Sequence, residues 1–167
     1  MPRSYFWILY LHILGACLYV GAVAFFAILL QSLRRRLPPE EFAGETAAIV
    51  RFYHPFILVC MGVLILTGAW YLTGLKAAMG PGFGAIFVPL GLKLGTVFLM
   101  VLGMSFQFFA LGLRLTRGTG PAGNGRPPAA GTEERLALIG AIERTNLVNL
   151  LLGLLAIFFG LALNKGF

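Results

Sequence analysis

The sequence predicts an all-α integral membrane protein, built as an antiparallel bundle of four transmembrane helices. Of its 167 residues, 59% are hydrophobic and only 11% are charged. Apolar runs cover about 5–33, 51–73, 86–113 and 136–163. Each run exceeds or matches the ~20 helical residues that a hydrocarbon core requires. We therefore expect a single four-helix membrane domain over residues 1–167.

The basic residues predict how this bundle is oriented. Arg34, Arg35 and Arg36 follow the first run, and a second group of arginines surrounds the third connection. Loops rich in Lys and Arg stay in the cytoplasm. Both termini should then lie outside, in a multi-pass protein of the bacterial inner membrane. The net charge of +7 is explained by lipid headgroups, so we expect the bilayer and no nucleic acid as a partner.

The connections differ in character. Pro39, Glu40 and Glu41 are typical of a first helical turn. The apolar residues that follow share one face and favour a short interfacial helix before the second span. They are Phe42, Thr46, Ile49 and Tyr53. The third connection, at 118–131, is rich in Gly and Pro and should be a flexible loop.

Two ionisable residues are expected at equal depth. His12 and Lys93 each lie about 10 Å below the outer end of their span, at 1.5 Å per residue. Small residues around His12 allow another helix to pack closely. An ionisable group in lipid costs ~3 kcal/mol or more, so both groups should face the bundle. The alternative for Lys93 is that its side chain extends to the outer headgroups.

The third run carries a stripe at helical spacing that includes thioethers and an amide. Its members are Lys93, Val97, Met100, Met104, Gln107, Leu111 and Arg114. A methionine stripe usually serves packing. The alternative is a ladder of soft ligands for Cu(I), or an axial thioether for haem iron.

The fourth run has a stripe of amides and small residues, which predicts close packing against a neighbour. Its members are Asn146, Asn149, Gly153, Ala156 and Gly160. His54, near the cytoplasmic start of the second span, should lie about 15 Å from His12 and cannot share one iron with it. His54 could join Gln107, Asn146 and Asn149 in an inner polar cluster, or be a plain interfacial histidine.

Several classes of protein are excluded by their missing motifs. The sequence has no P-loop, no Rossmann glycine pattern and no paired carboxylates or catalytic triad. Cys17 and Cys60 fall inside predicted spans without a CxxC or zinc pattern, and we expect two buried apolar thiols. Redox chemistry, cofactor or metal handling, and permeation remain.

Short segments resemble the CopD-type (copper-resistance protein D) membrane domain. LHILGA at 11–16 and VG at 20–21 are similar to its first helix. FYHP at 52–55 and LTGAW at 66–70 resemble its second helix, and LKL at 92–94 its third. The related HemJ-type protoporphyrinogen oxidases share this four-helix plan, bind haem and use a first-helix His and a third-helix Lys. The resemblance implies these roles for His12 and Lys93.

These observations give a leading hypothesis, a haem b-binding, redox-active membrane protein of the CopD/HemJ-like superfamily. It would transfer electrons or oxidise a small substrate such as a porphyrinogen, as a membrane oxidoreductase. His12 would be the axial ligand, Lys93 would pair with a propionate or an acidic substrate group, and Met100 would be a second ligand or a pocket wall. Further candidates for cofactor contact are His54, Met104 and Gln107.

Two other hypotheses stay open. The first is copper transport or copper resistance without enzymatic activity, with successive soft sites at His12, Cys17, Cys60, Met100 and Met104. The second is a structural subunit or assembly factor, for which the small-residue stripe and the basic loops suffice. Four helices form a thin shell around a cofactor, so we expect a homodimer or a subunit of a respiratory complex.

Overall fold

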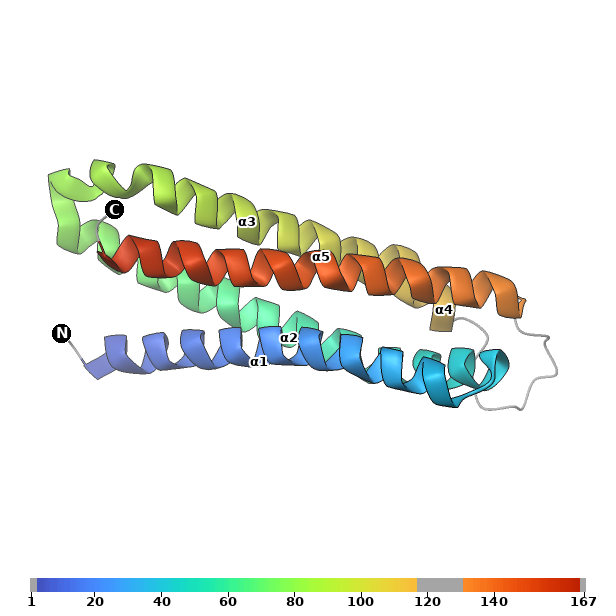
Figure 1. Ribbon diagram of the computed structural model, residues 1–167. Helices are drawn as coiled ribbons and strands as arrows, with labels where there is room; N and C mark the ends of the chain where they lie inside the picture. The colour runs from blue at the N-terminus through green and yellow to red at the C-terminus, as the bar shows by residue number, and fades with distance from the viewer. Residues whose placement is uncertain (1–2, 117–130, 166–167) are drawn as a thin grey trace.

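The computed structural model describes residues 3–116 and 131–165, and over these residues the chain is helical without strands. Long helices run side by side, and both ends of the chain lie at the same end of the bundle (Figure 1). The elements are α1 (Arg3–Arg36), α2 (Pro39–Met79), the 3₁₀ segment η1 (Gly80–Ile86), α3 (Phe87–Phe106), the π-helical segment η2 (Gln107–Gly112), α4 (Leu113–Thr116) and α5 (Thr132–Lys165).

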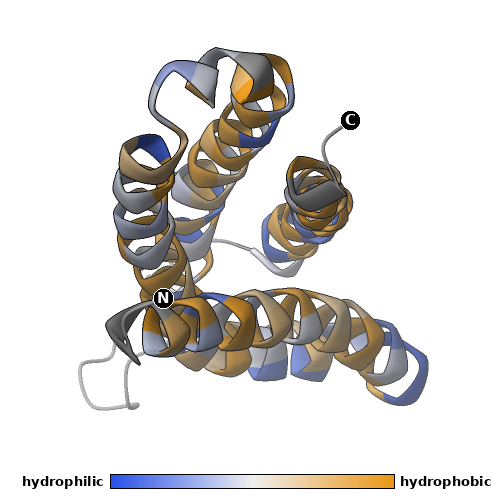
Figure 2. Cartoon of the chain, turned by 90° about the vertical axis from the view of Figure 1, so that its left-hand side faces the viewer, coloured by the Kyte–Doolittle hydropathy of each residue, from blue (hydrophilic) through white to orange (hydrophobic). Residues whose placement is uncertain are grey.

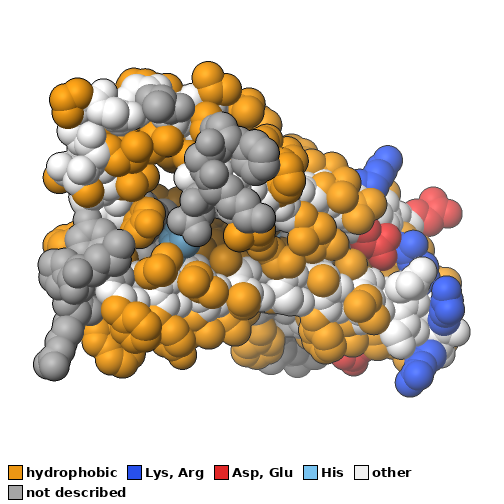
Figure 3. Space-filling model, turned by 60° about the vertical axis from the view of Figure 1, so that its left-hand side comes forward, with side chains coloured by type: hydrophobic (Ala, Val, Ile, Leu, Met, Phe, Trp, Pro, Cys, Tyr) orange, Lys and Arg blue, Asp and Glu red, His pale blue; other side chains and the backbone are white. Residues whose placement is uncertain are grey.

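Four of the helical stretches described are long and apolar enough to cross a membrane, which confirms the predicted class of multi-pass helical bundle. Hydrophobic residues predominate along the helices (Figure 2), and hydrophobic side chains cover much of the face shown in Figure 3. Phe52 is 81% exposed, Val88 74% and Leu66 73%. Such a surface is stable only against lipid tails, because water would penalise this much apolar area.

The helices pack as two pairs. α1 lies along α2, α3 lies along α5, and α1 joins the pairs by contacting α5. α2 and α3 themselves make almost no contact; α2 instead meets η2 and α4 at the arginine-rich end. η1 closes the other end. α2 and α3 are therefore separated in the half of the bundle away from the arginines, and we call this separation the lateral window.

The segment predicted as a short interfacial helix is the first part of α2 and not a separate helix. The chain turns at Leu37 and Pro38, and α2 then runs unbroken from Pro39 through Pro55 to Met79. The face predicted to lie at the interface packs on the bundle instead, with Phe42 2% exposed and Thr46 fully buried. How this segment sits relative to a membrane surface stays a prediction, as does the orientation of the whole bundle.

The third span contains a π-helical turn that the sequence pattern did not reveal. Met100, Met104, Gln107 and Leu111 are buried as predicted, but Arg114 is exposed and Leu115 takes its place in the core. A π turn holds one residue more than an α turn, so it rotates everything after it relative to the original stripe. The extension of the stripe to Arg114 was therefore wrong.

The arginine-rich end is fixed by contacts between distant segments. Arg34 donates to Glu143 at 2.7 Å and stacks over the Phe42 ring, 5.4 Å from its centroid. These contacts join the end of α1 to α5 and to the start of α2. The connection at 118–130, predicted to be a flexible loop, lies outside the described residues.

Candidate functional site

His12 is held against α2 by a hydrogen bond in the outer half of the bundle. Its Nδ1 lies 2.8 Å from Thr67 Oγ1. The Thr67 hydroxyl in turn lies 2.6 Å from the carbonyl oxygen of Val63, one turn earlier in α2. Gly68 makes room for the ring, because a Cβ there would come 3.3 Å from His12 Cε1.

This hydrogen-bond chain assigns the state of the imidazole. A hydroxyl has one proton, and the Thr67 proton goes to the Val63 carbonyl. The Thr67 oxygen then accepts from His12 Nδ1–H, so Nε2 of the neutral ring keeps its lone pair. Histidines that bind metals commonly donate their other nitrogen to a protein oxygen in this way. His12 is therefore oriented as a metal ligand would be.

Lys93 reaches the same layer from α3. Its Nζ lies over Gly160 of α5, where a Cβ would come within 3.3 Å of it. The charge of Lys93 acts electrostatically on His12. Both side chains are half-buried and turned toward other helices rather than outward. The structure thus brings together the two residues that the depth argument placed at equal height.

The layer of His12 and Lys93 lies beside the lateral window. At the end of the molecule away from the arginines, the space-filling view shows a hollow bordered by hydrophobic side chains, with a histidine visible inside it (Figure 3). α1 and α5, which carry His12 and Gly160, also contact each other.

The two methionines lie deeper than His12. Met100 is seven residues beyond Lys93, or about 10 Å along the helix, and its methyl group packs beside Gly153 and Tyr19. Met104 Sδ accepts a hydrogen bond from Asn149 Nδ2 at 3.3 Å. The structure therefore does not bring either sulfur opposite His12 Nε2. Both thioethers are core residues.

Below the methionines, the polar residues proposed as one inner cluster are buried, and their hydrogen bonds form separate groups. Tyr53 donates to Asn146 Oδ1 at 2.6 Å, and Asn146 Nδ2 donates to the carbonyl oxygen of Val23 at 2.9 Å. Tyr53 also stacks on Phe26, with ring centroids 4.0 Å apart. Asn146 is fully buried, so these bonds satisfy an amide that would otherwise be costly in the core. They join α1, α2 and α5.

His54 forms a separate group with Gln107 of η2. Gln107 Nε2 lies 3.4 Å from His54 Nε2, and both side chains are buried. Gly112 is required here, because a Cβ at this position would collide with the imidazole. Among the described residues, Tyr19 Oη, Gln107 Oε1 and Asn149 Oδ1 are buried without a hydrogen-bond partner. Polar atoms of this kind are usually bridged by internal water.

The two histidines define separate sites. Thr67, the partner of His12, is thirteen residues beyond His54 in α2, which places the imidazoles about 20 Å apart along the helix. They cannot ligate one iron in one chain. Over 3–116 and 131–165, no three His, Cys, Asp or Glu side chains come together as a metal cluster.

The cysteines are placed differently from one another. Cys60 is buried, as expected, but Cys17 is exposed on the outside of the bundle. The expectation of two thiols buried in the protein was wrong for Cys17, because its face of α1 is turned toward lipid, whose tails shield a thiol as a protein core does. The structure does not line the thiols up with the methionines.

Sequence reasoning missed several residues of these sites. Thr67 gave no signal, since a threonine in an apolar helix commonly bonds its own backbone, as Thr67 also does. Tyr19 and Tyr53 were placed on helix faces without a role. The sequence did contain one signal, two adjacent polar side chains, Tyr53 and His54, within an apolar run. Both are buried in the structure and form part of a polar layer at this depth.

Comparison of the chain with protein-family models, with curated proteins and with solved structures finds no match. The fold and its buried polar layers define the class: a multi-pass helical membrane protein with ionisable side chains inside its bundle. Residues of this kind in a membrane interior are costly and mark functional sites by default.

Proposed function

We propose that this chain is a haem b-binding, redox-active membrane protein with His12 Nε2 as an axial ligand of the iron. One observation carries the proposal. The bonds from His12 to Thr67 and from Thr67 to Val63 fix the ring and leave the lone pair of Nε2 available.

Lys93 would supply a positive charge for an acidic group of the haem or of a substrate. Its ammonium lies in the same layer as His12, where it would pair with a haem propionate or with an acidic group of a substrate. In a low-dielectric interior such a pair also offsets the cost of burying the ammonium. The lateral window would admit the flat ring system from the lipid side.

The chain's contribution is binding, orientation and electrostatics. When bound, haem supplies one-electron transfer, and its axial ligand and surroundings tune the potential. Gly68 and Gly160 let His12 and Lys93 lie close to the neighbouring helices. Electron transfer and oxidation of a small substrate are both compatible with this site.

An absorbance spectrum of the purified protein, oxidised and reduced, tests the proposal. We expect a Soret band in the wild type that is lost or shifted in His12→Ala. His54→Gln is the matched control, since it changes the other histidine about 20 Å away and should keep the band. A wild type that binds no haem when expressed with excess haem, or an unchanged band in His12→Ala, would contradict the assignment.

The metal content of the same preparation distinguishes the haem hypothesis from the copper hypothesis. Elemental analysis should find iron in proportion to the Soret band. Stoichiometric copper without iron, lost in a variant carrying both Met100→Leu and Met104→Leu, would favour the copper-handling hypothesis. Met104 already accepts a hydrogen bond from Asn149, so we expect these substitutions to leave haem content unchanged.

A further inference from the structure

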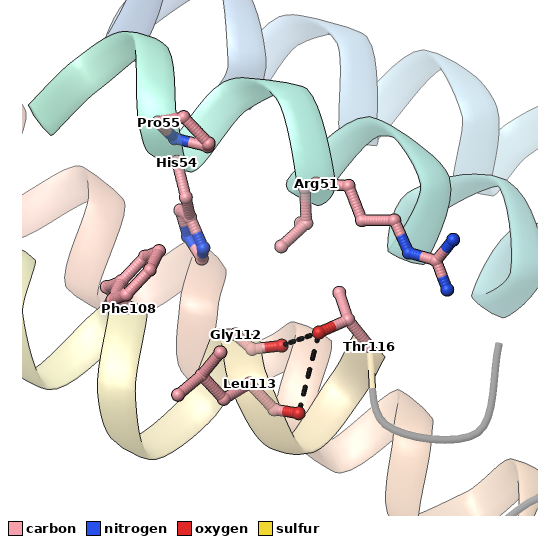
Figure 4. A pocket seen from close by; sticks show the side chains of 8 residues that line it. Arg51, His54, Pro55, Phe108, Gly112, Leu113 and Thr116 are labelled. Atoms are coloured by element: carbon pink, nitrogen blue, oxygen red, sulfur yellow. Dashed lines mark hydrogen bonds between the residues drawn. The ribbon is translucent and has the colours of Figure 1, made fainter. Parts of the chain in front are cut away.

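A second pocket lies at the arginine-rich half of the bundle, between α2 and the π-helical segment η2. It has a volume of about 220 Å³. Figure 4 shows the side chains around it, with His54 and Pro55 on α2 facing Phe108, Gly112 and Leu113. Val50, Arg51 and Thr116 complete the lining. Neither His12 nor Lys93 contributes to it.

The walls of this pocket suit a single ring. His54 and Phe108 stand at 64° to each other with ring centroids 5.6 Å apart, so the two rings form adjoining walls. Most of the remaining lining is aliphatic. The volume is below the roughly 300–1,000 Å³ of pockets that enclose whole drug-sized ligands. A ligand would therefore place one ring inside and leave the rest of the molecule outside.

Three polar side chains line the pocket, Arg51, His54 and Thr116, and His54 is the most deeply buried of them, only 3% exposed. With the Gln107 amide in this orientation its nitrogen is the donor to His54 Nε2, 3.4 Å away, and this assigns the ring proton of the neutral imidazole to Nδ1. Nδ1 lies against Gly112, where a Cβ would collide with it. His54 thus presents a buried donor at the pocket wall, and such a donor recognises a carbonyl or hydroxyl oxygen.

The mouth of the pocket opens on the apolar outside of the bundle. Leu113 is 37% exposed, and Arg51 and Pro55 are exposed as well. A tail attached to the bound ring would leave past these residues into the acyl chains. The ligand chemistry that fits is a flat uncharged ring with oxygen substituents and an apolar tail.

We propose that this pocket binds the ring of a lipid-soluble quinone, with one ring oxygen accepting a hydrogen bond from His54 Nδ1. The π turn makes the site. It brings Phe108 and Gly112 of one segment to the two sides of the imidazole, and π turns inside α-helices are frequent at functional sites. Binding here does not depend on haem at His12, so the two proposals fail or hold separately.

Binding of decylubiquinone to the full chain in phosphatidylcholine nanodiscs, followed by calorimetry, tests the proposal. We expect saturable binding of one molecule per chain. Leu113→Trp fills the mouth from an exposed position and should weaken binding by about tenfold or more. Leu102→Trp is the matched control, 50% exposed on the same span outside the pocket, and should change affinity by less than about twofold.

Gly112→Ala is the second variant, because its Cβ displaces His54, and it should also weaken binding; gel filtration in detergent verifies that the variant is folded. His12→Ala should bind decylubiquinone like the wild type. Absence of saturable binding, or equal binding by the two Trp variants, would overturn the proposal. So would phosphatidylglycerol displacing the quinone while Leu113→Trp has no effect, which would assign the pocket to a lipid headgroup.

Discussion

At the scale of single residues, small uncharged partners position the larger polar groups inside this bundle. Thr67 orients His12, and Gly112 and Gly160 make room for His54 and Lys93. None of these partners carries charge. Each allows a polar side chain to lie inside the bundle in one orientation, which is the requirement for a ligand site.

Thr67→Val should reduce haem affinity about 10–100-fold while the chain still folds, because His12 Nδ1–H loses its acceptor. Val has nearly the shape of Thr, so packing is retained. Thr67→Ser keeps the hydroxyl and should bind haem like the wild type. Haem titration of the apoprotein measures both; equal affinities in the Val and Ser variants would remove Thr67 from the site.

Gly103→Ala should destabilise the bundle by about 1–3 kcal/mol. A Cβ at 103 would come 2.9 Å from Asn149 Oδ1, and moving Asn149 breaks its bond to Met104. Gly95→Ala in the same helix meets nothing within 4 Å and should be neutral or stabilising. Thermal unfolding in detergent should therefore give shifts of different sign, and a common shift would contradict this reading of the glycines.

Much of this residue-level picture follows from helical periodicity. The spacing placed His12 and Lys93 at one height and turned Asn146 and Asn149 inward, because one lipid-crossing helix fixes depth and face together. Periodicity does not identify contacts between helices. Thr67 could therefore not be paired with His12, and the free thiol of Cys17 could not be assigned to the lipid side, before the neighbours of each face were known.

At the scale of elements, η2 is the feature with the largest effect. Up to Leu111 the third span follows the predicted stripe, and beyond it the inward positions shift so that Gly112 and Leu115 are buried and Arg114 is exposed. The QFFALG segment contains no Pro and only a terminal Gly, so its composition does not predict a π turn. The turn is set by packing, with His54 filling the space above Gly112.

Deletion of Phe109 should be tolerated, because a π turn that loses one residue becomes a regular α turn and its flanks keep their places. Phe109 is 65% exposed, so little packing is lost. Deletion of Leu99, 53% exposed in the regular part of α3, should disrupt the bundle by rotating all later residues by ~100°. Elution profile and melting temperature distinguish the two; the reverse order of stability would contradict a π turn here.

At the scale of the whole molecule, opposite ends differ in charge. Most of the described arginines lie toward the end where α1 stops and α5 starts, whereas Arg3 and Lys76 lie toward the other end, where η1 carries no charged residue. The positive-inside rule predicts that the arginine-rich end is cytoplasmic.

Cysteine labelling tests this orientation. In a variant carrying Cys17→Ala and Cys60→Ala, a cysteine introduced by Gly82→Cys should react with a membrane-impermeant maleimide in intact cells. One introduced by Glu40→Cys should react only after the cells are broken open. The opposite pattern would invert the topology, and with it the leaflet assigned to His12 and Lys93.

The separation of α2 and α3 has a consequence for how any ligand of His12 is delivered. A compound dissolved among the outer acyl chains would arrive sideways, by diffusion in two dimensions, without crossing water. Its supply would be governed by partitioning into the bilayer rather than by its aqueous concentration. Hydrophilic molecules of the same size would not partition into the bilayer and so would not reach His12. The bilayer itself would therefore select among possible ligands.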